Sequence, residues 1–354
     1  MVCRILLPLL FLTQVLPGLS QPNRTVKKRF LLRTVAFYNL ENLFNTVNDS
    51  LVHDDEHTPG GSYGWTDKRL ERKLDNLARV LGEIGKEYGA NPPDLIGVCE
   101  VENILLLERL VNRPPLYNYP YGIIHFDSPD PRGIDVALIY RKDRFFPLDQ
   151  QSFRLLIHNA NGRRKYTRDQ LVVSGFLDQD PVFFLINHWP SRGGNAHLNR
   201  EYRKDAALLQ RRLIDSIFQR HPDAKIISAG DFNDNPKDPS LKILKGKHQA
   251  EARDRSLFNP MEAFYRSGVG SLAYRDRWNL FDQILFSRAW IEPEPNTYRF
   301  WKAGVHQPDY LKNRDGRFQG YPYRTHAGGR YQGGYSDHFP VYAYLIRPAG
   351  KEAN

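Results

Sequence analysis

Cysteine is nearly absent from this 354-residue sequence, which contains only Cys3 and Cys99. Two cysteines cannot build a disulfide framework, so hydrophobic burial has to stabilise the fold. Hydrophobic residues make up 41% of the sequence, enough for a sizeable core in one large domain or two ordinary ones. Cys99 follows the apolar residues Leu95 to Val98 and has no histidine near it in sequence, so we expect a buried strand thiol and no nucleophilic role.

Long apolar runs are also missing, and the one notable stretch lies at the N-terminus. Arg4 precedes the apolar run Ile5 to Val15, and Pro17-Gly18-Leu19-Ser20 follows it, which is the three-part layout of a secretory signal. The run is too short to span a bilayer. We therefore expect a signal peptide at 1–20, a polar basic segment at 21–32, and export to the periplasm or cell exterior after cleavage. The alternative is a buried N-terminal helix.

The formal net charge is +10, from 50 Lys and Arg against 40 Asp and Glu. A basic surface raises the local concentration of anionic partners such as nucleic acid, anionic lipid and small phosphoesters. Solubility of a secreted protein explains the same charge equally well. The sequence does not indicate an oligomeric state.

Short β-branched or aromatic runs bounded by turn residues predict strands. They are Thr34–Tyr38, Leu95–Cys99, Val136–Tyr140, Leu171–Phe176, Val182–Asn187, Lys225–Ala229, Phe281–Phe286 and Val341–Leu345. Apolar residues at helical spacing, with charged outer faces, predict helices at Asp67–Tyr88 and Leu198–Arg220. Because strands outnumber helices and the two do not alternate, we predict an α+β fold with packed sheets. The Gly-, Tyr-, Arg- and Pro-rich stretch from Asn296 to Tyr335 predicts long surface loops.

Polar and titratable side chains recur where predicted strands end or begin. The segments are Tyr38-Asn39-Leu40-Glu41, Val98-Cys99-Glu100, Asn187-His188-Trp189-Pro190, Gly230-Asp231-Phe232-Asn233, Phe281-Asp282-Gln283 and Ser336-Asp337-His338-Phe339-Pro340. Each segment alone also suits a structural role, such as a turn in which Asp and Asn bond their own backbone. Together they indicate one site. Oxygen ligands such as Glu100 and Asn39 suit Mg²⁺, and the lack of a Cys cluster or a His-x-x-x-His pair argues against structural zinc.

In this order the segments resemble the endonuclease/exonuclease/phosphatase superfamily, metal-dependent phosphoesterases that include pancreatic deoxyribonuclease, abasic-site endonucleases, neutral sphingomyelinases and inositol-polyphosphate 5-phosphatases. The resemblance covers Arg33 to about Ile346, and the forms Tyr-Asn-Leu-Glu-Asn-Leu-Phe and Asn-His-Trp-Pro-Ser-Arg are similar to exported bacterial branches. It implies a four-layer α/β/β/α sandwich of two packed mixed sheets with outer helices. It also implies a catalytic domain at 33–347, followed by a tail at 348–354.

The resemblance further implies roles for the matching residues. Glu100 would bind the metal, with Asn39 beside it and Asp337 as a further ligand. His338 would be the acid/base histidine, and Asp282 would be the carboxylate that orients it.

A second group of residues matches the family's contacts to water and phosphate. Asp231 would align the attacking water or a second metal, and Asn233 would contact the phosphate. His188 would donate to a phosphate oxygen, and Asp135 stands where its partner carboxylate is expected. The sequence departs from the nuclease pattern at Glu41, where some nucleases have Asp, and this difference leaves the substrate open.

Four side chains are candidate substrate contacts. Arg192 and Trp189 follow His188 closely. Tyr166 and Arg168 belong to a basic, aromatic segment that would hold a phosphate backbone and stack on a base, or else form an ordinary solvated loop.

The sequence therefore predicts an Mg²⁺-dependent hydrolase of phosphoric ester bonds, with Mn²⁺ or Ca²⁺ as alternative ions. Its expected substrate is DNA or RNA, which it would cleave by metal-assisted attack of water. The alternatives are a phosphatase or phosphodiesterase acting on lipid or sugar phosphates, and a catalytically silent binding module on the same fold.

Overall fold

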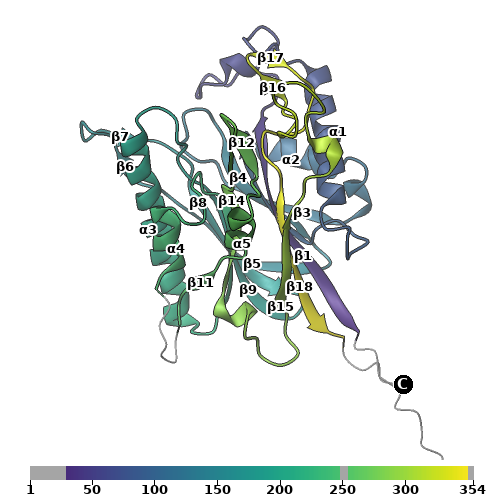
Figure 1. Ribbon diagram of the computed structural model, residues 1–354, viewed down its shortest axis with the longest axis vertical. Helices are drawn as coiled ribbons and strands as arrows, with labels where there is room; N and C mark the ends of the chain where they lie inside the picture. Colours follow the sequence, from purple (N-terminus) through teal and green to yellow (C-terminus); the bar gives the residue numbers. More distant parts are fainter. Residues whose placement is uncertain (1–28, 248–253, 350–354) are drawn as a thin grey trace, which may run out of the picture.

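The computed structural model describes residues 29–247 and 254–349, in which two mixed sheets of six strands pack face to face (Figure 1). In spatial order the first sheet contains β15 (Arg299–Val305), β18 (Val341–Pro348), β1 (Phe30–Leu43), β2 (Leu95–Val101), β4 (Asp135–Arg141) and β3 (Tyr121–His125). The second sheet contains β11 (Leu257–Phe258), β14 (Asp282–Ser287), β10 (Lys225–Asp231), β9 (Asp180–His188), β8 (Gln170–Leu177) and β5 (Phe145–Phe153). The predicted signal peptide lies outside the described residues.

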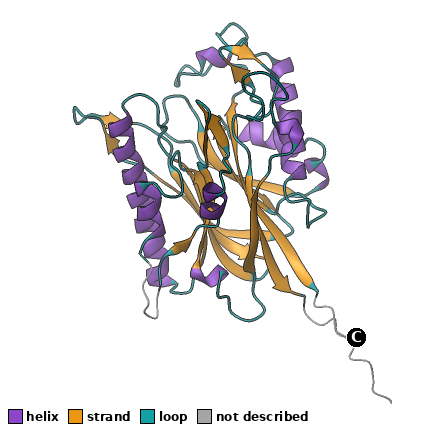
Figure 2. Cartoon of the chain, in the orientation of Figure 1, coloured by secondary structure: helices purple, strands orange, loops and turns teal. Residues whose placement is uncertain are grey.

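Helices cover the outer faces of both sheets (Figure 2). The α-helices are α1 (Asp67–Glu83), α2 (Ile104–Val111), α3 (Ala196–Arg220), α4 (Pro239–Lys245) and α5 (Met261–Arg266). The short hairpins are β6 (Ile157–His158) with β7 (Arg164–Lys165), β12 (Leu272–Tyr274) with β13 (Arg277–Asn279), and β16 (His326–Ala327) with β17 (Arg330–Tyr331). The 3-10 helices are η1 (Asp55–His57), η2 (Leu116–Asn118), η3 (Arg288–Trp290) and η4 (Asp309–Leu311). No helix in the described ranges is long and apolar enough to cross a membrane.

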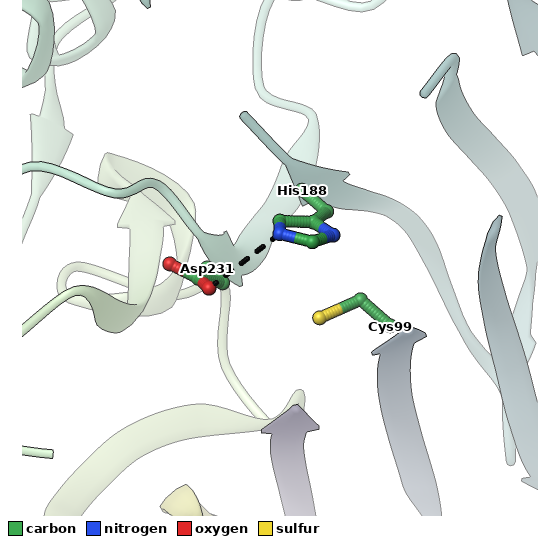
Figure 3. A group of neighbouring side chains, drawn as sticks. All are labelled: Cys99, His188 and Asp231. Carbon is green, nitrogen blue, oxygen red and sulfur yellow. Dashed lines mark ion pairs between the residues drawn. The ribbon is translucent and has the colours of Figure 1, made fainter. Parts of the chain in front are cut away.

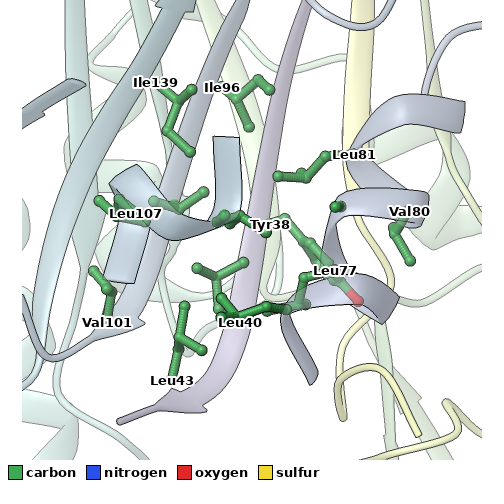
Figure 4. Packing of buried hydrophobic residues seen from close by; sticks show 14 of the residues in the cluster. Tyr38, Leu40, Leu43, Leu77, Val80, Leu81, Ile96, Val101, Leu107 and Ile139 are labelled. Carbon is green, nitrogen blue, oxygen red and sulfur yellow. The ribbon is translucent and has the colours of Figure 1, made fainter. Parts of the chain in front are cut away.

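The alternation of side chains along β1 explains the layers. Val35 and Phe37 point into the core between the two sheets, whereas Ala36 and Tyr38 pack in the cluster beneath α1 and α2. Figure 4 shows Tyr38 and Leu40 of β1 against the apolar face of α1. Because successive strand residues point to opposite faces, a strand covered on both sides is apolar throughout. The predicted sandwich with outer helices is confirmed.

All eight predicted strands and both predicted helices are present, with two corrections. The first helix ends at Glu83, not at Tyr88, because Gly85 adopts a left-handed backbone (φ +79°) where a Cβ would lie 2.8 Å from Thr34 Cγ2. The stretch from Asn296 to Tyr335 is not loop throughout, since β15 pairs there with β18. The alternation of apolar and polar residues along β15 is weak, because β15 is an edge strand with many exposed positions.

A buried cation joins α1, β1 and the last long loop. The side chain of Lys73 is fully buried, and its Nζ donates to Glu41 O at 2.8 Å and to Tyr335 O at 3.2 Å. Nζ also lies 3.7 Å from the Glu41 carboxylate, which accepts from Thr325 N at 2.6 Å. Glu41 therefore attaches the loop around Thr325 to the end of β1.

We expect Lys73→Met to lower the free energy of unfolding by about 3–5 kcal/mol, because it leaves the buried Glu41 carboxylate without its cation. Urea denaturation measures this change. Lys68→Met, at an exposed position of the same helix, is the matched control and should change stability by less than about 0.5 kcal/mol. Equal effects of the two substitutions would contradict the expectation.

Aromatic and histidine rings pack together above α1, next to β16. His57 stacks on Phe44 with ring centroids 4.1 Å apart, and Tyr63 lies against both His57 and His326. Burial lowers the pKa of His57 from 6.5 to about 4, and the neighbouring His326 acts in the same direction. Between these two pH values the unfolded chain binds more protons than the folded chain, so this histidine destabilises the protein as the pH falls.

We therefore expect the stability of His57→Phe, relative to the parent, to increase as the pH falls from about 6.5 to about 4, since the variant has no buried imidazole to protonate. Urea denaturation of both proteins across this range tests it. His53→Phe, at an exposed position, should show no such trend. A stability difference between parent and His57→Phe that is independent of pH would refute the argument.

Candidate active site

The polar strand ends converge at one edge of the two sheets. β1 runs parallel to β2, and β9 runs parallel to β10, so the C-terminal ends of each pair meet at the same edge. Asn39 is paired in register with Cys99, which precedes Glu100, and Asp231 is paired with both His188 and Asp282. β14 and β18 are antiparallel to these strands and begin at this edge, which brings Asp282 and His338 to it.

Side chains from both sheets meet around the Asp231 carboxylate. His188 Nε2 lies 3.7 Å from Asp231 Oδ2 and 3.7 Å from Glu100 Oε1. His338 Nε2 lies 3.9 Å from Asp231 Oδ2 and 4.0 Å from Asp337 Oδ1. The structure thus brings together Glu100, His188, Asp231, Asp337 and His338, as the sequence predicts.

Asn39 connects the two sheets through its side-chain amide. Its Nδ2 donates to Glu100 Oε1 and to Asp231 Oδ2, both at 3.1 Å, while its Oδ1 accepts from Glu41 N at 2.8 Å. The amide nitrogen, not the oxygen, therefore faces the carboxylates. In this arrangement Asn39 orients Glu100 and Asp231, whereas the sequence pattern predicts a metal ligand.

His338 and Asp282 form a close buried pair, with Nδ1 2.6 Å from Oδ2. Burial acts to lower the pKa of His338, but the carboxylates of Asp282 and Asp231 outweigh it and raise the pKa well above 6.5. Burial also raises the pKa of Asp231 to about 7, in spite of the neighbouring imidazole. The neighbouring carboxylates therefore favour the protonated form of His338, and burial favours the protonated form of Asp231.

His188 has no carboxylate partner on its second ring nitrogen. Its Nδ1 is buried without a hydrogen-bond partner among the described residues. The expected partner, Asp135, instead lies 3.0 Å from His125 Nε2 and accepts from Ser128 N at 2.7 Å. The reason is register: His125 opposes Ala137 on the antiparallel strand, so Asp135 lies diagonal to His125 on the same sheet face. The pairing predicted between Asp135 and His188 is wrong.

Asn233 forms hydrogen bonds within and next to the turn that follows β10. Its backbone N–H donates to Asp231 Oδ1 at 2.9 Å, and its Nδ2 donates to Trp189 O at 2.9 Å. The preceding Gly230 has no room for a side chain, because a Cβ would lie 2.6 Å from Asn187 O. The Gly-Asp-x-Asn segment therefore fixes the Asp231 carboxylate, and the amide nitrogen of Asn233 is engaged by backbone.

Left-handed backbone conformations occur at several non-glycine residues of this edge. They are Glu41 (φ 50°), Asn42 (φ 52°), Glu100 (φ 61°) and Asn233 (φ 51°). Such conformations cost free energy and are retained where surrounding contacts hold them, often at functional sites. At Glu100 the holding contact is Asn42 N, which donates to Oε2 at 2.9 Å.

Cys99 is fully buried, as expected for a strand thiol. The fold brings it beside His188 and Asp231, two residues that are distant in sequence, and ligand atoms of the three lie within 4.8 Å of one another (Figure 3). Burial and the nearby Asp231 carboxylate raise the pKa of the thiol well above 9. The thiol is therefore protonated and unsuited to act as a nucleophile.

The carboxylates at this edge suit a hard divalent cation. Each oxygen of Glu100 accepts one N–H bond and retains a further lone pair, and 15% of its side chain is exposed. Asp337 is 30% exposed and is joined to Arg324 at 3.4 Å. Asp231, Asp282 and His338 present further oxygen and nitrogen atoms within 4.8 Å of one another. Oxygen-rich, partly exposed sets of this kind match the ligand preference of Mg²⁺ or Mn²⁺.

The four predicted substrate contacts have different surroundings. Trp189 is 1% exposed and packs edge-on against Phe232 in the core beneath α3, so it cannot touch a substrate. Arg192 is partly exposed, but its guanidinium is bound by Asp234 and by Asn233 O.

The other two predicted contacts line a groove next to this edge. Arg168 is buried and Tyr166 is 48% exposed. Of these two side chains, only Tyr166 is exposed enough to offer its ring to a ligand in the groove.

Two positioning residues escaped the sequence analysis. Ser336 Oγ donates to Asn39 O at 2.7 Å and accepts from His338 N at 3.1 Å, so it joins β1 to the segment that carries His338. Ser271 Oγ accepts from Asp282 N at 3.3 Å, and its carbonyl accepts from Phe339 N at 2.7 Å. Ser336 could be suspected from its place before Asp337 and His338. Ser271 lies in a loop with no sequence signal.

Because Trp189 is a core residue, we expect Trp189→Ala to lower the free energy of unfolding by about 3–5 kcal/mol. Denaturant unfolding measures the loss. Tyr166→Ala removes an exposed aromatic ring nearby and should change stability by less than about 0.5 kcal/mol. A fully stable Trp189→Ala protein would show that this ring does not support the core.

Comparison with solved structures shows the same fold in several phosphoesterases. An endonuclease/exonuclease/phosphatase family protein from Bacteroides thetaiotaomicron superposes with a TM-score of 0.53 at 17% identity, covering 90% of this chain and 96% of that one. A mannosyl-6-phosphatase from the same organism gives 0.52 at 18%, covering 88% and 99%. TDP2 from D. rerio, complexed with a single-strand DNA product, gives 0.52 at 15%, covering 89% and 98%.

Sequence comparison gives the family directly. No curated protein matches this chain. Residues 34–347 match the model of the Endonuclease/Exonuclease/phosphatase family, which is most of the chain. The converging carboxylates and histidines lie within the matched residues. The chain therefore belongs to the Endonuclease/Exonuclease/phosphatase family.

Proposed function

We propose that this phosphoesterase is a divalent-metal-dependent phosphodiesterase that hydrolyses nucleic acid by attack of an activated water. The observation that supports it most directly is that His188 Nε2 and His338 Nε2 lie 3.7 and 3.9 Å from Asp231 Oδ2, and that His188 Nε2 also lies 3.7 Å from Glu100 Oε1. A phosphodiester resists attack because it is negatively charged. Catalysis then consists largely of positioning and of stabilising charge in the transition state.

Each side chain has a chemical task in this proposal. Asp231, whose pKa is raised to about 7 by burial, aligns the water and accepts its proton. His338, kept protonated by Asp282, donates to the reacting phosphoryl group or leaving oxygen. His188, whose Nε2 lies 3.7 Å from Asp231 Oδ2, donates to a phosphate oxygen.

Glu100 is the proposed principal metal ligand, with Asp337 as a further ligand and Asn39 holding Glu100 in place. When bound, Mg²⁺ or Mn²⁺ supplies charge that stabilises the phosphoryl and leaving oxygens. The chain's part is to fix Glu100 through two N–H donors, so that its carboxylate needs little reorganisation on binding.

Nucleic acid is the proposed substrate because the net charge of +10 favours an extended polyanion. A structural neighbour is complexed with single-strand DNA, and another is a mannosyl-6-phosphatase. The alternative substrates are therefore sugar or lipid phosphates. Export of the protein is a further proposal, and it rests on the signal-like sequence of residues 1–20.

The purified protein should hydrolyse bis-(p-nitrophenyl) phosphate with Mg²⁺ or Mn²⁺ and lose this activity in EDTA. We expect His338→Ala to lower kcat by about 10²- to 10⁴-fold, the usual contribution of a positioned acid or base. Glu100→Gln should also abolish most turnover and should weaken metal binding measured by calorimetry.

Thermal unfolding must show that both variants remain folded. Glu108→Gln, at an exposed position of α2, is the charge-matched control and should retain parental kcat. Parallel incubation with plasmid DNA, RNA, inositol phosphates and a mannose phosphate identifies the substrate class. Release of no product from any of them, with or without metal, would favour a silent binding module and overturn the proposal.

A further inference from the structure

A groove of about 820 Å³ lies beside the candidate active site. The β6–β7 hairpin and the N-terminal end of α3, which are neighbours in Figure 1, form two of its walls. Pro190 and Ser191, which follow His188 and Trp189 in sequence, form a third. The groove therefore begins where the strand that carries His188 ends.

Positive charge dominates the lining of this groove. Its cationic side chains are Arg132, Arg164, Lys165 and Arg168, and Asp130 is the single acidic residue that lines it. Asp130 is shared, since it accepts from Arg168 Nη1 at 2.9 Å and lies 3.4 Å from Arg132 Nε. One carboxylate cannot neutralise four cations, so the groove attracts an anion.

Several guanidinium donors in the groove are buried without an acceptor among the described residues. Arg168 is 6% exposed, and its Nη2 donates to Trp189 O at 2.8 Å, but its Nε has no partner. Nε and Nη2 of Arg164 also lack partners. Buried donors without acceptors are costly. The two guanidinium groups of this lining therefore have hydrogen-bonding capacity that the described residues do not use.

A shared backbone group connects the groove with the candidate active site. The carbonyl of Trp189 accepts hydrogen bonds from both Arg168 and Asn233, so one backbone group joins the groove to the turn that holds Asp231. Trp189 also directly follows His188 in sequence, so the groove adjoins the residue that is proposed to contact the cleaved phosphate.

The groove also offers aromatic surface. Tyr166 is 48% exposed, and the Arg164 guanidinium lies 4.5 Å from its ring centroid. Aromatic rings beside guanidinium groups are the combination with which proteins bind single strands, where bases stack and phosphates are neutralised.

We propose that this groove binds a second phosphate of the substrate, next to the one that is cleaved, and that the natural source of that phosphate is a single-stranded nucleic acid whose base stacks on Tyr166. The proposal rests on the proposed function for the identity of the cleaved group. Binding in the groove, however, does not require turnover.

The test separates binding from catalysis. Fluorescence anisotropy of a fluorescein-labelled single-stranded oligonucleotide in EDTA measures binding, and hydrolysis of bis-(p-nitrophenyl) phosphate, which has one phosphate, measures chemistry. We expect Arg164→Ala and Lys165→Ala each to weaken oligonucleotide binding roughly tenfold. Each substitution should also reduce the slope of log affinity against log salt concentration by about 1, because one phosphate contact is lost. Tyr166→Ala should weaken binding by a similar factor without changing the salt dependence.

Arg200→Ala is the matched control, since Arg200 is exposed on the same end of α3 but does not line the groove. It should leave binding unchanged. Equal effects of Arg164→Ala and Arg200→Ala would overturn the proposal, because the attraction would then be a general surface effect. If inositol polyphosphate binds with the same Arg164 dependence while the oligonucleotide does not, the second phosphate has another source and the nucleic-acid part is wrong.

The two proposals fail separately. Oligonucleotide binding that depends on Arg164 without any hydrolysis would remove the catalytic proposal and keep the groove. Hydrolysis of bis-(p-nitrophenyl) phosphate without oligonucleotide binding would remove the groove proposal and keep the catalytic one.

Discussion

The side-chain amide of Asn39 joins the two sheets at the edge where the site lies. It donates to Glu100 in its own sheet and to Asp231 in the facing sheet, both at 3.1 Å. Two carboxylates that close would repel each other in a buried setting, and an amide N–H pair between them reduces that repulsion. This contact fixes the Asp231 carboxylate, near which both histidines lie, with His188 Nε2 at 3.7 Å and His338 Nε2 at 3.9 Å from its Oδ2.

The two histidines differ because their surroundings differ. His338 has a carboxylate at Nδ1, and its pKa is raised. His188 has no partner at Nδ1 within the described ranges, and burial together with neighbouring arginines lowers its pKa. The two imidazoles that lie near Asp231 Oδ2 therefore have pKa values shifted in opposite directions. Opposite shifts of this kind suit the acid and base functions that we propose for this group of residues.

The backbone at the site is held by contacts from distant segments. Glu41, with its left-handed φ, is bound by Lys73 from α1 and by Thr325 from the last long loop. Ser336 joins the same strand end to the segment of His338. The long loop between β15 and β18 is thus part of the scaffold that holds the site.

The sequence by itself determined the main strands, the two long helices and the residue types of the site. Apolar alternation shows which runs are buried, and Asn39, Glu100, Asp231 and His338 stand where such runs end. The order of these segments was also sufficient to indicate the family. These features are local, so spacing along the chain is enough to reveal them.

Tertiary structure alone decided which of these residues touch. Asp135 pairs with His125 and not with His188 because of the β3–β4 register, and Trp189 enters the core because its side chain points beneath α3. The direction of the Asn39 amide and the unpartnered donors of Arg164 also depend on groups far away in sequence. The sequence indicates which side chains lie near a strand end, but the packing of the two sheets determines which atoms each of these side chains faces.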